Sequence, residues 1–143
     1  MDQMQTTTLA YRFAETLNTQ DIAAFDDFIV AEYVNHNSYA APGRAGMKAL
    51  FTNWLEAFPD THVTVEDALG VDDKVIGRFT YRGTHRAIFF PGSPFGVAPT
   101  GRVITIRSID IWRVENGKIV EHWDELNLLD VAQQLGISLT DSP

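Results

Sequence analysis

The 143-residue chain contains no cysteine. Disulfide bonds, thiolate nucleophiles and cysteine-ligated zinc are therefore excluded. Basic residues are also scarce, with 11 Lys and Arg against 19 Asp and Glu, for a formal net charge of −8. Non-specific binding to nucleic acid or to anionic membranes needs clustered positive charge, so we expect neither partner.

Long apolar runs and several well-known motifs are missing too. No stretch approaches the ~20 apolar residues of a membrane span, and the N-terminal stretch MDQMQTTTLAYRFAE lacks the basic start and apolar run of a secretory signal. There is no phosphate loop, dinucleotide glycine pattern, Gly-x-Ser-x-Gly elbow or helical pair of zinc-binding histidines. We therefore expect a cytoplasmic protein without a membrane segment.

The length and the hydrophobic content of 45% suit one domain, which we place over residues 1–143. The first half predicts helices. Leu9, Phe13 and Leu17 recur at helical spacing, residues 22–29 predict a short second helix, and residues 33–41 predict a loop. The stripe from Met47 to Phe58 predicts a third helix that ends before Pro59.

The second half changes to a strand pattern. Segments rich in β-branched and aromatic residues predict four strands, at 62–69, 75–85, 102–114 and 119–127. Asn116-Gly117 predicts a tight hairpin turn between the last two, and residues 128–135 predict a final short helix. Helices followed by a strand meander favour an α+β fold, a cone-shaped barrel in which a curved antiparallel sheet packs against N-terminal helices around an enclosed pocket.

Strand alternation selects the candidate chemical groups, since residues two apart share a face. His122 and Asp124 share the expected inner face of the last strand with apolar neighbours. A carboxyl group in such a place has its pKa raised toward the range useful for proton transfer. The alternative is a structural carboxylate paired to an arginine or capping a backbone group.

The preceding strand repeats the pattern, because Ser108 and Asp110 interrupt an apolar row. Two inward carboxyl groups on neighbouring strands, Asp110 and Asp124, are able to share a proton or divide acid and base roles. The alternative is a bulge that turns Asp110 outward to meet Arg107 or Arg113.

Other candidates come from the second strand, the first loop and the third helix. Tyr81 and His85 fall in one inward row, and His36 lies in a loop flanked by asparagines. A histidine such as His85 is more often structural than catalytic. Phe51 and Trp54 belong to the core or to the pocket wall.

Several short motifs occur in a recognisable order. They are Ala57-Phe58-Pro59-Asp60, Gly83-Thr84-His85, Pro99-Thr100-Gly101-Arg102, the segment from Asn116 to Asp124, and Gln133-Gln134-Leu135-Gly136. The set resembles the SnoaL-like proteins, the polyketide cyclase branch of the NTF2-like superfamily. This fold hosts many reactions, so the resemblance is more specific for family than for chemistry.

The resemblance implies a cone-shaped α+β barrel that self-associates, and a cofactor-free aldol closure of a polyketide ester. It assigns the acid/base role to Asp124 and a pocket position to His36. The chain departs from the family where the cyclases place a histidine and an amide, because Asp110 and Ser108 align there.

The leading hypothesis is an acid/base enzyme of polyketide (ester) cyclase type acting on a small hydrophobic carbonyl compound. Asp124, His36 and Asp110 would be catalytic, and the substrate-binding residues would be His122, Ser108, Trp54, Phe51, Tyr81 and His85. The alternatives are a hydrolase or isomerase of the epoxide-hydrolase or ketosteroid-isomerase kind, and a non-catalytic ligand-binding module. We expect no metal or organic cofactor and a homodimer or homotetramer.

Overall fold

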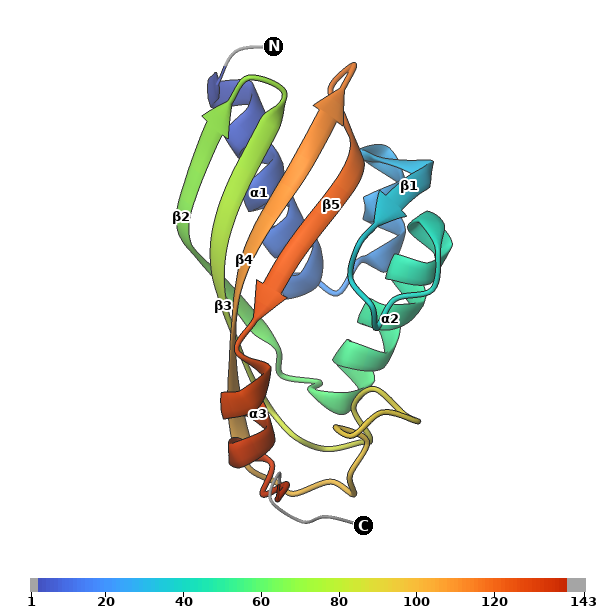
Figure 1. Ribbon diagram of the computed structural model, residues 1–143, viewed down its shortest axis with the longest axis vertical. Coiled ribbons are helices and arrows are strands. Elements are labelled where there is room, and N and C mark those ends of the chain that lie inside the picture. The colour runs from blue at the N-terminus through green and yellow to red at the C-terminus, as the bar shows by residue number, and fades with distance from the viewer. Residues whose placement is uncertain (1–2, 139–143) are drawn as a thin grey trace.

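Five strands form one curved sheet in the order β1-β5-β4-β3-β2 (Figure 1). The computed structural model describes residues 3–138. The strands are β1 (Ile29–Asn35), β2 (His62–Val71), β3 (Lys74–Thr84), β4 (Val103–Glu115) and β5 (Lys118–Leu126). Strands β2 to β5 pair antiparallel, whereas β1 pairs parallel with β5. The sheet therefore curls without closing, and β1 and β2 remain its two edges.

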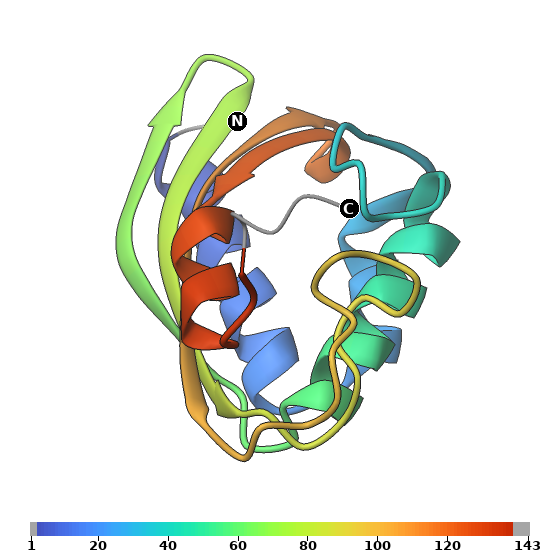
Figure 2. The same cartoon turned by 60° about the horizontal axis from the view of Figure 1, so that its bottom comes forward.

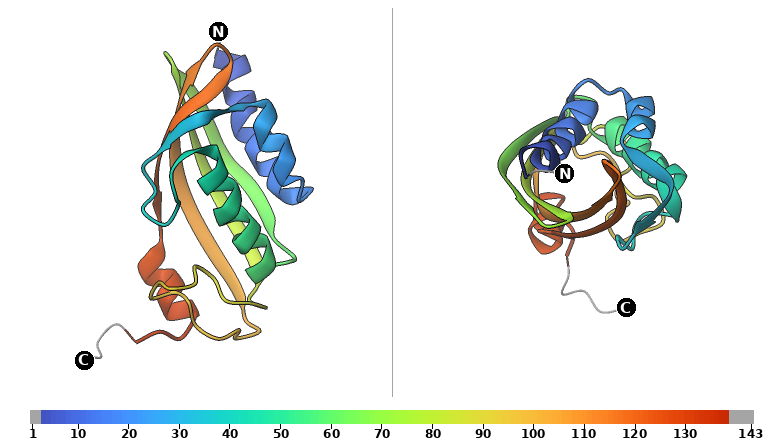
Figure 3. Two further views of the ribbon diagram at one scale, coloured as in Figure 1. Left: turned by 90° about the vertical axis from the view of Figure 1, so that its right-hand side faces the viewer. Right: turned by 90° about the horizontal axis from the view of Figure 1, so that it is seen from above.

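Helices cover the inside of this curl. They are α1 (Gln3–Asn18), the 3₁₀ helix η1 (Ile22–Asp27), α2 (Gly43–Ala57) and α3 (Leu128–Gln134). Seen from above, α1 and α2 close the open side of the curled sheet (Figure 3). Helix α1 packs on β2 and β3, α2 packs on β1, and α3 packs on β4. The helices and the sheet thus enclose a common interior, as the sequence predicts.

The centre of that interior is aromatic. The ring of Phe13 on α1 lies 5.2–5.9 Å from the rings of Phe25, Phe51, Phe79 and Trp112, and all five side chains are buried. Edge-to-face and tilted pairs of this kind add about 0.5–1.5 kcal/mol each beyond the area that they bury. This cluster holds α1 and α2 against the sheet.

Most predicted elements are confirmed. The four antiparallel strands and the last helix form within a few residues of their expected bounds. The two helices predicted from the apolar residues around Leu9 and Met47 also form. Asn116 and Gly117 have φ values of 51° and 77°, the left-handed pair that a tight hairpin turn requires. This turn places β4 and β5 side by side, and the candidate carboxyl groups with them.

One strand is missing from the sequence prediction. The prediction assigned Ile29 to a short helix and residues 33–41 to a loop, but 29–35 form β1. Ile29 and Tyr33, both buried, are four residues apart, a spacing that imitates a helix. The register between β1 and β5 also shifts between Ile29 and Val34, so the two-residue alternation that signals a strand is interrupted.

A second correction concerns the start of β5. Ile119 was expected on the outer face, but it is fully buried. Arg113 pairs with Glu121 while Val114 pairs with Ile119, which leaves Val120 as an extra residue, a β-bulge. The alternation resumes after the bulge, so His122 and Asp124 still point inward. Within residues 3–138, no helix is long and apolar enough to cross a membrane.

Candidate functional site

A small cavity of about 30 Å³ lies between the concave face of the sheet and α2. A space of this size holds about two water molecules. Its apolar wall includes Phe13, Phe51, Trp54, Phe90 and Trp112, and its polar side is formed by Asn35, Asn37, Ser108, Asp110, His122 and Asp124. The polar groups are therefore gathered on β1, β4, β5 and the turn after β1, facing an aromatic wall.

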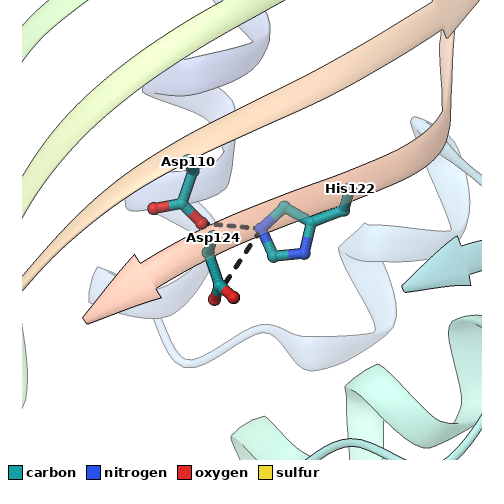
Figure 4. Close-up of side chains that lie close together, drawn as sticks. All are labelled: Asp110, His122 and Asp124. Atoms are coloured by element: carbon teal, nitrogen blue, oxygen red, sulfur yellow. Dashed lines mark hydrogen bonds and ion pairs between the residues drawn. The ribbon is translucent and has the colours of Figure 1, made fainter. Parts of the chain in front are cut away.

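Three ionisable side chains meet on β4 and β5 (Figure 4). Asp110 and Asp124 are direct register partners. His122 Nε2 lies 2.7 Å from Asp110 Oδ2 and 3.9 Å from Asp124 Oδ2. Asp110 and His122 are buried, so the alternative that a bulge turns Asp110 outward is wrong.

Asn35, at the end of β1, determines which nitrogen of His122 carries a proton. The Asn35 Oδ1 atom accepts the backbone N–H of Asn37 at 3.0 Å, which fixes the oxygen side of the amide. The same oxygen lies 2.8 Å from His122 Nδ1. Because an amide oxygen only accepts, Nδ1 of His122 must be protonated.

This tautomer constrains the bond on the other side of the ring. A single proton lies between His122 Nε2 and Asp110 Oδ2, either on the imidazole as an ion pair or on the carboxyl group. Asp110 Oδ1 also accepts a 2.6 Å hydrogen bond from Ser108 Oγ. The Asp110–His122 pair is thus fully hydrogen-bonded in the interior and carries no net charge in either form.

Asp124 has a different environment. Its two carboxylate oxygens accept hydrogen bonds from Asn37 Nδ2 at 3.2 and 3.0 Å. Asn37 is oriented in turn by the backbone N–H of Tyr39, which donates to its Oδ1 at 2.8 Å. Burial raises the pKa of Asp124 above its ordinary value, while the His122 ring and the Asn37 hydrogen bonds act in the opposite direction and Asp110 adds to the rise.

Two tyrosines complete the polar side of the cavity. Burial, together with the charge of Asp110, raises the pKa of both Tyr33 and Tyr81 well above the usual value, so both hydroxyl groups remain protonated donors. The Tyr81 hydroxyl lies 3.4 Å from Ser108 Oγ. Since Ser108 gives its one proton to Asp110, Tyr81 donates to the serine in this contact.

The structure brings seven of the predicted site residues together. Those that line the cavity are Phe51, Trp54, Tyr81, Ser108, Asp110, His122 and Asp124. No Arg or Lys of the described chain lines it. Arg113, one of the two arginines considered as a partner of Asp110, instead pairs with Glu115 and Glu121.

His36 does not join this group. Its backbone N–H continues the β1–β5 pairing by donating to His122 O, and its side chain points to the opposite face of β5. There the ring stacks on Trp123 with centroids 5.1 Å apart, and Nε2 lies 2.8 Å from Glu121. His36 borders an open surface depression that Asp124 also reaches, but the side chain that bonds to the Asp124 carboxylate is Asn37.

His85 also lies away from the cavity. Its Nδ1 accepts the backbone N–H of Thr100 at 3.1 Å, and its backbone exchanges hydrogen bonds with Arg102 and Gly101. Burial lowers the pKa of His85, which favours the neutral ring. The residue therefore closes the base of the segment between β3 and β4, the structural role that the sequence already suggested for it.

Sequence reasoning did not select nine of the residues that line the cavity, and four of these lie outside the predicted helices and strands: Tyr33, Asn35, Asn37 and Phe90. Tyr33, Asn35 and Asn37 alternate along the chain, and this alternation was the available signal that they share one face of a strand. It carried no weight because 33–41 was expected to be a loop. Nothing in the local pattern distinguishes Phe90 from the other aromatic residues of its segment.

The acidic groups and His122 are also close enough for a metal ion. One ligand atom from each of Asp110, His122 and Asp124 lies within 4.8 Å of the others, a nitrogen and oxygen set that suits a divalent cation. Binding would displace the proton that lies between His122 Nε2 and Asp110 Oδ2. The expectation that no metal is needed stays a prediction.

The family model for SnoaL-like polyketide cyclase matches residues 8–135. A search of curated proteins found no match. Solved structures that are similar include TsrD from Streptomyces laurentii, with 28% identity, a TM-score of 0.86, and coverage of 96% of this chain and 99% of that one.

Two further structures give the same result. AclR from Streptomyces galilaeus has 27% identity and a TM-score of 0.82, covering 94% of this chain and 98% of its own. IdmH from Streptomyces antibioticus has 30% identity and a TM-score of 0.71, covering 87% and 93%. The likeness therefore extends over nearly the whole length of each chain.

Proposed function

Because the chain belongs to the SnoaL-like polyketide cyclase family, we propose that it is an acid/base enzyme that performs aldol chemistry on a hydrophobic carbonyl compound, with Asp124 as the base. The observation that carries this proposal is the unequal setting of the two carboxyl groups. Asp110 is neutralised by His122, whereas Asp124 faces the cavity with a raised pKa. In the described part of the chain, its one cationic partner is the more distant His122 ring.

In this mechanism Asp124 removes a proton from the carbon next to a carbonyl group. The C–H electron pair forms an enolate, which attacks a second carbonyl carbon of the same molecule and closes a ring. The protonated Asp124 then gives its proton to the new alkoxide, so the carboxylate is regenerated. A raised pKa favours both steps, because the group must take and return one proton in each turnover.

The enolate oxygen needs a hydrogen-bond donor. Tyr33 lines the cavity and keeps its proton, and the His122 ring lies between the two carboxyl groups. Preorganised donors of this kind stabilise charge that develops in the transition state. We assign this role to Tyr33, because Nδ1 and Nε2 of His122 are already hydrogen-bonded to Asn35 and Asp110.

No observation favours epoxide hydrolysis, since an arginine between two acids, which that chemistry uses in related proteins, is absent from the described cavity lining. The aldol proposal also accounts for the aromatic wall, which suits an apolar substrate body.

Proton abstraction can be tested without knowing the natural substrate. The enzyme would be incubated in D₂O with ketones such as 1-tetralone, and deuterium entry at the carbon next to the carbonyl would be followed by NMR. We expect exchange above the buffer rate, and a loss of about 10²–10⁴-fold in Asp124→Asn.

Glu125→Gln is the matched control, because Glu125 is an exposed carboxylate next to Asp124 on the same strand. Its exchange rate should stay within about two-fold of wild type, since exposed charges are screened. Equal rates in wild type and a folded Asp124→Asn would refute the role of Asp124. Absence of exchange with every ketone tried would refute the proton-abstraction step.

A further inference from the structure

We propose that Phe90 determines the size of the compound that reaches Asp124. The enclosed cavity, at about 30 Å³, is far smaller than a ring-containing ketone. Ligand pockets for such compounds are about 300–1,000 Å³. A substrate of the proposed class therefore requires a side chain to move, and the structure indicates which one.

Two open depressions lie beside the cavity, and each shares lining residues with it. One depression, of about 600 Å³, lies between α2 and the segments 38–41 and 90–94. The other, of about 160 Å³, reaches Asp124 between Asn37 and Leu126. Among the described residues, Phe90 alone lines all three spaces, so its ring is the common wall between them.

The ring is held by stacking. It lies parallel to the ring of Tyr39, with centroids 4.8 Å apart and planes 3° apart, and it stacks on Phe89 on its own segment. Tyr39 is 37% exposed, so solvent already reaches the outer half of this pair. The two segments that meet here both lie beside α2, on the same side of the molecule (Figure 2).

The backbone around Phe90 is fixed more firmly than its ring. Asn53 on α2 accepts the Phe90 N–H at 3.0 Å and donates to Ile88 O at 2.9 Å. Phe90 has a φ of 48°, a left-handed conformation that a bulky residue rarely adopts. Strained conformations of this kind persist at ligand clamps because the surroundings hold them. A rotation of the ring can therefore open the wall while the segment stays anchored to α2.

The partner segment is equally well anchored. A Cβ atom on Gly46 of α2 would lie 1.8 Å from the backbone oxygen of Ala41, so only glycine lets 38–41 approach α2 this closely. Tyr39 is thereby held opposite Phe90. With both backbones fixed, rotation of the two rings would join the cavity to the depressions without moving the sheet or its carboxyl groups.

The choice of ketones as ligands rests on the proposed function. The test itself measures binding and needs no turnover, so it can fail or succeed independently of that function. Trp54 and Trp112 line the cavity and report on it, and Trp123→Phe removes the third tryptophan, which lies on the outer face. In this background, stopped-flow fluorescence would give association rates for cyclohexanone, 1-tetralone and 9-fluorenone, which have one, two and three rings.

We expect association to slow as rings are added in the parent protein. Phe90→Ala should raise the association rate of 9-fluorenone by about ten-fold or more and that of cyclohexanone by less than about three-fold. The reason is that only the larger ligand needs the Phe90 ring to be out of the way. Tyr39→Ala should act in the same direction. Phe90→Leu provides a milder variant should Phe90→Ala unfold, as judged by circular dichroism.

Phe95→Ala is the control, since Phe95 also contacts Tyr39 but does not line the cavity. It should leave the three rates within about three-fold of the parent. The inference would be overturned if Phe90→Ala raised the association rates of all three ketones equally, or if a folded Phe90→Ala still excluded 9-fluorenone. It would also be overturned if Phe95→Ala showed the same dependence on ligand size. Exchange is judged with 1-tetralone, because 9-fluorenone has no hydrogen on the carbons next to its carbonyl group. If 1-tetralone enters Phe90→Ala faster but does not undergo exchange, the proposed function would be refuted and the role of Phe90 would stand.

Discussion

Asp110 and Asp124 face each other in the register of β4 and β5, yet their carboxyl groups have different partners. Asp110 is hydrogen-bonded to His122 and Ser108, whereas among residues 3–138 the side-chain donor to Asp124 is the amide of Asn37. Two titratable groups whose surroundings differ in this way are suited to different roles. Asp110 is placed to hold the His122 ring, and Asp124 to exchange a proton with a ligand.

Asp124→Asn should not destabilise the protein at neutral pH. Burial raises the pKa of Asp124 in the folded state, so the folded chain binds this proton more tightly than the unfolded chain. The resulting stability is present below the unfolded value of about 3.9 and is lost as pH rises through the folded pKa. We expect a melting temperature at pH 7 equal to or above wild type.

The matched control, Asp60→Asn, should change the melting temperature in the opposite direction. Hydrogen bonds from the backbone and side chain of Thr84 lower the pKa of Asp60, so its carboxylate stabilises the fold above pH 4 or so. Asp60→Asn should therefore lower the melting temperature at pH 7. A melting temperature for Asp124→Asn that falls as far as that of Asp60→Asn would contradict the assigned environment of Asp124.

Asn37→Ala should move the acid limb of the activity profile to higher pH. The Asn37 hydrogen bonds hold the pKa of Asp124 down against burial, so their removal raises it further. Deuterium exchange measured against pH would show the shift. Asn53→Ala, which removes an amide from α2 away from Asp124, should leave the limb in place. An unshifted limb in Asn37→Ala would show that another group controls the profile.

Asp110→Ala should be strongly destabilising, because it leaves His122 and Ser108 without their buried partner. Breaking a buried ion pair costs about 3–5 kcal/mol in the free energy of unfolding. Asp73→Ala removes an exposed carboxylate that pairs with Lys74 at 3.1 Å and should cost far less, because exposed ion pairs contribute little to stability. Urea denaturation would compare the two. Similar costs would mean that the Asp110–His122 pair contributes little to folding.

Tyr33→Phe should slow exchange by about 10²-fold if its hydroxyl group donates to the enolate, the loss typical for one oxyanion donor. The ring and its packing would be kept, but the hydroxyl group is also the hydrogen-bond partner of the buried Trp112 side chain. The melting temperature should therefore fall somewhat, because the Trp112 N–H is left unpaired. Tyr11→Phe, at a tyrosine that is 56% exposed, controls for the loss of a hydroxyl. Full activity in Tyr33→Phe would show that the Tyr33 hydroxyl group is not the donor to the enolate.

We propose that the outer face of the sheet joins two copies of the chain. Ile109 is 54% exposed, and with Ile111 and Trp123 it lines an outer depression of about 530 Å³. Sedimentation velocity should show a dimer or larger assembly, and Ile109→Arg should weaken it. Leu129→Arg on α3, at a residue that is 63% exposed, should have no such effect. A monomer at high concentration would contradict the proposal.

The sequence by itself determined the inward row of Ser108, Asp110, His122 and Asp124. A strand exposes alternate residues to each face, and the Asn116-Gly117 turn fixes which strands are neighbours. Both signals are local, so they can be read without the fold. The bulge at Val120 left the result unchanged because it precedes His122.

Only the tertiary structure decided what surrounds these groups. The parallel pairing of β1 with β5 brings Asn35 and Asn37 to His122 and Asp124 and turns His36 outward. The same holds for Phe90, which reaches the cavity through contacts with Tyr39 and Asn53. These contacts join segments roughly 40 to 90 residues apart, and their distances depend on how the helices and loops pack, which no local pattern of residues encodes.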